Sequence, residues 1–144
     1  MVIRSPTPAD VEAVLDLFAA IDWGSFHPHA RDLATAEWVA SYAGRDVYLL
    51  GWEGAEAVAY GLLRGWDEGY ETPRLGIATR PAFEGQGHGR AMMRALTHAA
   101  RERGANRIAL RVSHANERAH RFYELSGFRD VGEERAERLM VLDL

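Results

Sequence analysis

Residues 80–104 read "RPAFEGQGHGRAMMRALTHAARERG", a stretch in which a glycine-rich turn runs directly into a helical pattern. Gly85, Gly87 and Gly89 occupy alternate positions just before that pattern begins. Glycine costs about 1 kcal/mol relative to alanine in a helix, so three of them at a first turn indicate that something approaches bare backbone there. The free N–H groups of a helix N-terminus attract anions, most often phosphate. The stretch therefore predicts a turn and helix that bind an anionic ligand.

The segments on either side of this stretch predict strands and a second helix. Residues 75–79 are apolar and precede the glycines, while residues 107–113, "RIALRVS", alternate apolar and polar side chains in the manner of a strand with one buried face. Asn116 is suited to cap a following helix, and Gly127 is suited to end it. The unit of highest regularity is thus a strand, a glycine turn and a helix, and we expect function to lie there.

The rest of the chain completes a mixed α/β domain. The sequence predicts a short strand at "VIR", a helix after Thr7 to Asp10, a second helix carrying Trp38 and ending by Gly44, strands over residues 46–53 and 55–66, and two closing strands over residues 128–134 and 136–144. No linker or internal repeat interrupts this order, so we expect one domain over residues 1–144.

Composition excludes several classes of protein. The chain has no cysteine, which rules out disulfide frameworks, thiolate metal sites and a cysteine nucleophile. All 17 basic residues are arginine, so the phosphate-binding loop that requires a lysine is excluded. A net charge of −4 argues against nucleic-acid binding. Without a membrane-spanning apolar run or a secretory signal pattern, we expect a cytoplasmic protein that binds neither nucleic acid nor membrane.

Two motifs carry a resemblance to a known family. The spacing of the glycines does not fit a dinucleotide fingerprint. Residues 77–96, "IATRPAFEGQGHGRAMMRAL", instead resemble the acetyl-CoA motif of the GNAT family of N-acetyltransferases, and residues 116–128, "NERAHRFYELSGF", resemble its second motif. The resemblance implies a mixed, mostly antiparallel central sheet flanked by helices. It also implies transfer of an acetyl group from acetyl-CoA to a primary amine by direct attack, without a metal.

The resemblance also assigns site residues. Backbone amides of the turn would surround the pyrophosphate, the strand before it would pair with pantetheine, and a tyrosine would be the general acid for the leaving thiolate. The residues implied are Gly85, Gln86, Gly87, His88, Gly89 and Arg90 for pyrophosphate, Ile77, Ala78 and Thr79 for pantetheine, Asn116 for orienting that arm, and Tyr123 for acid catalysis and donor contact. From the residues alone, Asn116 is equally a plain helix cap and Tyr123 a core aromatic.

Glu84 departs from the family pattern, which usually has Gln or Arg there. A carboxylate beside a diphosphate would weaken binding, so we expect the Glu84 side chain to turn toward solvent or to be neutralised by Arg80 or Arg90.

Residues 64–77, "RGWDEGYETPRLGI", contain the candidate general bases. Glu71 is the first choice and Glu68 the second, because a carboxylate near the acceptor amine attracts it and relays its proton. The alternative is a solvated acidic turn. His27 and His29 fit an acceptor loop better than a metal site. Aromatic residues near these segments line either an acceptor pocket or the core, namely Trp23, Phe26, Trp66 and Tyr70.

The sequence leaves several alternatives open. The acceptor is a small molecule, such as an amino sugar or amino acid, or a peptide. The acyl group is acetyl or larger, and the chain is a monomer or a homodimer. The competing class of function is a non-catalytic module that binds or senses acyl-CoA.

Overall fold

The computed structural model describes residues 1–21 and 32–144, and its central feature is a seven-stranded sheet with the order β1-β2-β3-β4-β5-β7-β6. The strands are β1 (Val2–Arg4), β2 (Val47–Glu53), β3 (Glu56–Arg64), β4 (Arg74–Thr79), β5 (Arg107–Val112), β6 (Arg129–Glu134) and β7 (Glu137–Asp143). All neighbours pair antiparallel except β4 and β5, which are parallel. The predicted mixed, mostly antiparallel sheet is confirmed.

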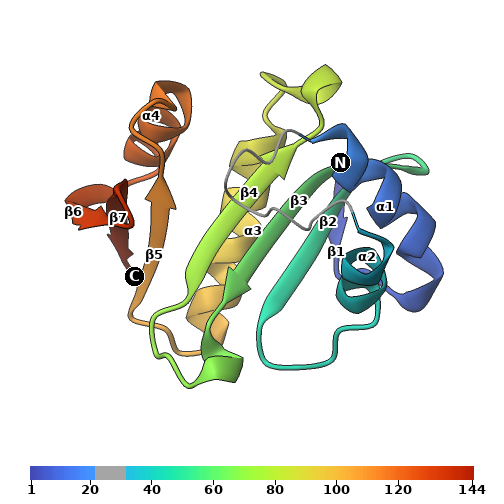
Figure 1. The fold of residues 1–144 in the computed structure, drawn as a ribbon, viewed down its shortest axis with the longest axis horizontal. Helices are drawn as coiled ribbons and strands as arrows, with labels where there is room; N and C mark the ends of the chain where they lie inside the picture. The colour runs from blue at the N-terminus through green and yellow to red at the C-terminus, as the bar shows by residue number, and fades with distance from the viewer. Residues whose placement is uncertain (22–31) are drawn as a thin grey trace.

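Helices cover both faces of this sheet (Figure 1). They are α1 (Val11–Ala20), α2 (Leu33–Ala40), α3 (His88–Glu102) and α4 (Glu117–Leu125), with short 3₁₀ turns η1 (Pro8–Asp10), η2 (Trp66–Glu68) and η3 (Pro81–Phe83). One core joins α1 and α2 to β2 and β3 and contains Leu17, Phe18 and Tyr60. The other lies on the α3 and α4 side and contains Met92, Leu96 and Tyr123. We refer to the two sides as the α1/α2 face and the α3 face.

The predicted order of elements agrees with the structure, but α2 is shorter than predicted. It ends at Ala40 rather than near Gly44. The Ser41 hydroxyl donates a hydrogen bond to the Glu37 carbonyl at 2.7 Å, and the Ser41 N–H donates to the same carbonyl at 3.1 Å. Hydrogen bonding by a serine to the last turn competes with helix continuation, which is why the helix stops there.

Strands β4 and β5 meet only at one end. Within these two fully described strands, the single paired position is Arg74 with Ala109, supported by an Ala109 N–H bond to the Pro73 carbonyl at 3.0 Å. Beyond that point they diverge, and Figure 1 shows β4 and β5 pointing apart. The glycine turn follows β4 and helix α4 follows β5, so both stand at the open end of the diverging strands.

A glycine in β3 sets how closely α3 approaches the sheet. A Cβ atom at Gly61 would lie 2.6 Å from Met92 Sδ and 3.0 Å from Leu96 Cδ1. The absence of a side chain therefore lets α3 pack directly on β3 and β4, which fixes the helix N-terminus at the end of β4.

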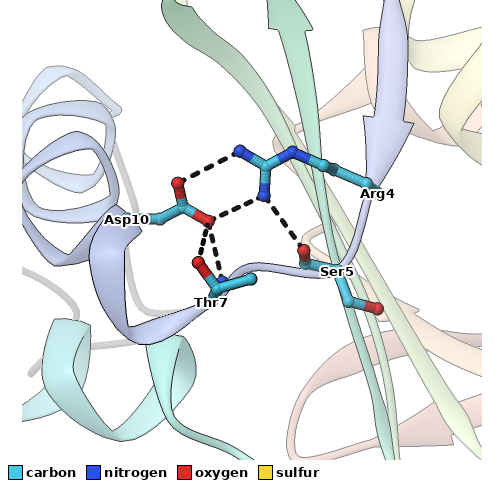
Figure 2. Close-up of polar contacts among 4 residues, drawn as sticks. All are labelled: Arg4, Ser5, Thr7 and Asp10. Atoms are coloured by element: carbon cyan, nitrogen blue, oxygen red, sulfur yellow. Dashed lines mark hydrogen bonds and ion pairs between the residues drawn. The ribbon is translucent and has the colours of Figure 1, made fainter.

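Hydrogen bonds to the Asp10 carboxylate connect the N-terminal strand β1 to α1. Figure 2 shows Arg4 and Asp10, whose side chains make two hydrogen bonds, 2.7 Å from Nη1 and 3.1 Å from Nη2. The same carboxylate accepts a bond of 2.7 Å from the Thr7 backbone N–H. Asp10 thus links the end of β1 to the turn that opens α1.

Candidate active site

The glycine turn has a backbone that other residues rarely adopt. Gly85 has φ +75° and Gly87 has φ +87°, and Gly87 caps the N-terminus of α3. A Cβ atom at either position would meet nothing within 4 Å, so backbone conformation rather than crowding requires glycine. Gly89 lies inside the helix, where a Cβ would stand 3.5 Å from the Phe122 ring of α4.

The N–H groups that open α3 are free. In the described parts of the chain, no protein acceptor pairs with the backbone N–H groups from Gly85 to Arg90, and the first bond of the series is Ala91 N–H to Gly87 O at 3.1 Å. Gln86 and Arg90 are exposed, and the Gln86 amide donates to the Ala82 carbonyl at 3.3 Å. Free N–H groups at the positive end of a helix dipole form a site for an anion.

His88 has a side-chain role that sequence reasoning missed. Its ring is buried, with Nε2 2.8 Å from Glu53 Oε1 and Nδ1 3.2 Å from the Phe83 carbonyl oxygen. One ring nitrogen thus contacts a carboxylate and the other contacts a backbone carbonyl. The hydrogen bond from His88 is the main reason that the pKa of Glu53 is lowered. The ring thereby anchors the first turn of α3 to the end of β2.

Glu84 is neutralised by a different arginine from those predicted. Arg118 of α4 lies 3.1 Å from the Glu84 carboxylate. The Arg80 guanidinium instead contacts Asp16 at 2.8 Å and the Ala57 carbonyl, so its partners are residues other than Glu84. The Glu84 side chain is exposed, in agreement with the first of the two predicted alternatives, whereas its ion-pair partner is Arg118 of α4 and not Arg80 or Arg90.

Helix α4 places Tyr123 and its N-cap residue Asn116 beside the open end of strands β4 and β5. Tyr123 is 9% exposed and packs edge-on against Phe122 and Phe128, with ring centroids 5.4 and 5.8 Å away. Burial raises the pKa of its phenol to about 12. No hydrogen bond to its hydroxyl occurs among the described residues. Asn116 is the N-cap of α4, since its Oδ1 accepts the Ala119 N–H at 3.1 Å, which leaves its amide NH₂ available.

The strand before the turn has one unpaired edge. Ala78 and Thr79 pair with Tyr60 and Ala59 of β3, whereas β5 pairs with β4 only at Arg74. Ile77, Ala78 and Thr79 are half-buried. An extended chain with amide groups can pair with such an edge as an added strand.

Glu71 does not lie with the glycine turn. It is exposed and lines a cavity of about 380 Å³ together with Tyr70, Arg103 and Asn106. This cavity lies at the C-terminal end of α3, whose 15 residues span about 22 Å. Glu71 precedes β4 at the end where Arg74 pairs with Ala109, so it stands on the joined side of β4 and β5, away from their open end.

The other candidates from the acidic segment have separate places. Glu68 is exposed, and its charge acts on Tyr48, which packs on the α1/α2 face. Trp66 is buried in the core of the α3 face. Asp67 accepts hydrogen bonds from the Tyr42 hydroxyl and, at 2.8 Å, from the Arg45 N–H, so it stabilises the turn. Trp23, Phe26, His27 and His29 lie outside the described residues.

A group of three potential metal ligands also lies at α4. His120 Nε2 is 3.0 Å from Asp130 and His120 Nδ1 is 3.6 Å from Glu124. The two carboxylates face different ring nitrogens, which suits hydrogen bonding of α4 to β6 better than joint coordination of one ion.

The glycine turn, the unpaired β4 edge and α4 form one site, and the family match covers all three. Residues 12–128 match the model of the Acetyltransferase (GNAT) family. The chain belongs to the GNAT acetyltransferase family. The match includes both motifs and every described residue of the candidate site.

Solved structures share this GNAT fold. The GNAT domain of S. lividans PAT superposes with a TM-score of 0.85 and 20% identity over 99% of this chain and 89% of that chain. PaiA N-acetyltransferase from Thermoplasma acidophilum, in complex with coenzyme A, gives 0.81 and 12% over 99% and 98%. The ribosomal-protein-S18-alanine N-acetyltransferase from Escherichia coli gives 0.75 and 20% over 99% and 92%. The search of curated proteins gave no match. Among the described residues, no helix has the length and apolar character to cross a membrane.

Proposed function

We propose that this GNAT protein transfers the acetyl group of acetyl-CoA to a primary amine of a small molecule or peptide. The observation that carries the proposal is the set of unpaired N–H groups from Gly85 to Arg90, next to the unpaired edge of β4. One end of the site suits a diphosphate and the adjoining edge suits an extended amide chain, and coenzyme A contains both. The neighbouring structure of PaiA with coenzyme A supports this assignment.

The turn residues would hold the donor. Amides from Gly85 to Arg90 would donate to the pyrophosphate, and the contacts of the His88 ring with Glu53 and the Phe83 carbonyl would hold the first turn of α3 in place. Pantetheine would pair with the backbone of Ile77, Ala78 and Thr79, and the free amide NH₂ of Asn116 would orient it from α4. The coenzyme must also pass the Glu84–Arg118 pair, in which Arg118 supplies the cation that position 84 lacks.

The reaction would follow from this placement. The neutral amine attacks the thioester carbon, a backbone N–H of the β4 edge stabilises the oxyanion, and the C–S bond breaks with its electron pair on sulfur. The Tyr123 hydroxyl would then give its proton to the thiolate. Burial keeps that phenol protonated at neutral pH, and the same low-dielectric surroundings make the thiolate a stronger base.

The amine must lose a proton before attack. Because Glu71 lies on the joined side of the strands, we assign it no direct transfer and propose that the proton leaves through water. Glu68 lies in η2, just after the β3 residue Arg64 that pairs with Arg74, so it also stands on the joined side and receives no direct role in this proposal.

An acceptor screen tests the proposal. Purified protein is mixed with acetyl-CoA and amino sugars, amino acids, polyamines or peptides, and free thiol is followed. Amine-dependent thiol release is expected. Binding of acetyl-CoA without thiol release from any amine would contradict transferase activity and favour an acyl-CoA-binding module.

Tyr123→Phe then tests the acid. The variant keeps the packed ring and removes only the proton, so kcat should fall roughly 10- to 1,000-fold while the Kd for acetyl-CoA changes little. Steady-state kinetics and calorimetry measure the two quantities. A wild-type kcat would make Tyr123 a core residue and assign thiolate protonation to water.

A further inference from the structure

The cavity of about 380 Å³ that Glu71 lines lies at the end of α3 opposite the glycine turn. Its walls come from three parts of the chain, namely the segment before β2, the loop between β3 and β4, and the end of α3. A second cavity of about 370 Å³ shares Arg45, Trp66 and Arg103 with it, so the two adjoin at these residues. Cavities of this size are typical of sites for small molecules.

The Arg103 guanidinium is held where the two cavities adjoin. Its Nε donates a hydrogen bond of 3.3 Å to the Arg45 carbonyl, and its central carbon lies 5.8 Å from the centroid of the buried Trp66 ring. A guanidinium stacked on an aromatic ring is fixed in orientation, while its remaining N–H groups stay free to donate. Across residues 1–21 and 32–144, no carboxylate pairs with Arg103.

Arg45 adds a second cation to the same walls. Its backbone is fixed, because its N–H donates to Asp67 at 2.8 Å and its carbonyl accepts from Arg103. The Arg45 side chain is exposed and makes no ion pair with any residue that the structure describes. Two arginines without carboxylate partners at one cavity favour a ligand that bears an oxyanion.

Most negative groups near the cavity already have partners. The Asp46 carboxylate accepts hydrogen bonds from two backbone N–H groups, at 3.1 and 2.9 Å. In the last turn of α3, the carbonyls of Ala99, Ala100 and Arg101 each accept a backbone N–H at 3.0–3.1 Å. Among the described lining residues Glu71 is the single carboxylate, so the lining carries two positive charges against one negative charge.

Tyr70 gives the cavity an exposed aromatic wall. It is 63% exposed, although large aromatic side chains are usually buried. The turn that carries it is closed by a 2.9 Å bond from the Tyr70 N–H to the Gly65 carbonyl, and a Cβ atom at Gly65 would lie 3.5 Å from Tyr70 Cβ. An aromatic ring exposed on a fixed turn can stack on a ring of a ligand.

We propose that this cavity binds a small molecule in which a carboxylate or phosphate is attached to a planar ring. Arg45 and Arg103 bind the anion, since the paired N–H donors of a guanidinium match the oxygens of either group, and Tyr70 packs on the ring. The site is separate from the donor site, because the 15 residues of α3 place about 22 Å between this cavity and the glycine turn. The proposal therefore goes beyond the transferase function and does not depend on it.

Benzoate and phenyl phosphate are the probes, and NMR titration measures the Kd of each for the full chain. At least one should bind, and the tighter of the two identifies the anion. Benzyl alcohol, which has the ring without the charge, should bind at least about tenfold more weakly. Arg45→Gln changes a side chain with no partner in the described parts of the chain, and it should raise the Kd of the anionic probe about tenfold. Arg103→Gln should raise it at least as much.

Three control variants separate this site from general effects. Arg101→Gln removes an exposed arginine that does not line the cavity, so it changes the net charge equally and should leave the Kd unchanged. Gly87→Val alters the donor turn and should bind the probe like the wild type, which excludes binding at the free N–H groups of α3. Glu71→Gln should lower the Kd, because it removes the carboxylate that repels the probe.

The outcomes that would overturn the proposal are distinct from failure of acetyl transfer. A wild type that binds neither probe, or an unchanged Kd in both Arg45→Gln and Arg103→Gln, would overturn it. An equal rise in Arg101→Gln would attribute the effect to net charge and would also overturn it, as would a loss of binding confined to Gly87→Val. Thiol release plays no part in these Kd values, so a protein without transferase activity would still give the same answer.

Discussion

His88 shows how one side chain stabilises a site that works through backbone. Its ring contacts Glu53 and the Phe83 carbonyl, and so fixes the peptide groups whose N–H donors form the proposed anion site. The free N–H groups give the site its chemistry, but their direction depends on the ring beneath them. Removing the His88 ring should therefore weaken the binding of acetyl-CoA.

His88→Leu removes the contacts with Glu53 and with the Phe83 carbonyl while keeping an apolar side chain at a buried position. We expect the Kd for acetyl-CoA to rise about tenfold, because two contacts that anchor the first turn of α3 are lost at once. Calorimetric titration measures it. Glu53→Gln, which keeps an acceptor oxygen but removes the negative partner, should give a smaller rise. An unchanged Kd in His88→Leu would restrict the ring to a packing role.

The residue-level predictions succeeded where information is local in the sequence. The alternate glycines predict a turn that runs into a helix, and Gly87 is the N-cap of α3, while the positive φ of Gly85 and Gly87 is a reason for glycine that the spacing alone did not give. The partners of His88 and Glu84 could not be predicted, because Glu53 and Arg118 lie 35 and 34 residues away in the chain. Only the tertiary fold brings such pairs together.

At the scale of elements, Asp10 joins β1 to the turn that opens α1. Its hydrogen bonds from Arg4 lower the pKa of the carboxyl from 3.8 to about 2. A carboxyl group whose pKa is lower in the folded state than in the unfolded state stabilises the fold at pH values above its unfolded-state pKa. This stabilisation is lost as the pH falls toward the folded-state pKa. The contribution should therefore be complete at neutral pH and decline below about pH 4.

Asp10→Asn keeps a capping side chain but removes the charge. We expect it to lower the free energy of unfolding by about 1–2 kcal/mol at pH 7, with the difference from wild type shrinking as pH drops below 4. Urea denaturation at a series of pH values measures this. Asp16→Asn, which removes an exposed carboxylate paired with Arg80, should change stability by less than about 0.5 kcal/mol. A pH-independent effect at Asp10 would indicate lost geometry rather than lost charge.

The order of elements could be predicted, but the place of a loop relative to a strand could not. Glu71 was predicted near the acetyl group because it lies close to β4 in sequence. It precedes β4, however, while the glycine turn follows it, and a strand of 6 residues separates the two by about 20 Å. Sequence proximity to an element does not say which of its ends a residue occupies.

At the scale of the molecule, the parallel β4–β5 step divides one sheet into two diverging parts. The part from β1 to β4 carries α1, α2 and α3, and the part from β5 to β7 carries α4 (Figure 1). Side chains from both parts meet at the open end, as the Glu84–Arg118 pair does. The proposed donor site therefore combines a turn from one part with a helix from the other, although the two are distant in sequence.

The central claim is that the glycine turn holds the donor, and calorimetric titration of acetyl-CoA into Gly87→Val and Gly104→Val tests it most directly. Both glycines have positive φ, +87° and +76°, with open space where a Cβ would stand, so both variants impose similar backbone strain. Gly104 lies at the other end of α3 and controls for lost stability. We predict that Gly87→Val, still folded, loses measurable acetyl-CoA binding while Gly104→Val binds like the wild type. Wild-type affinity in folded Gly87→Val would contradict the account.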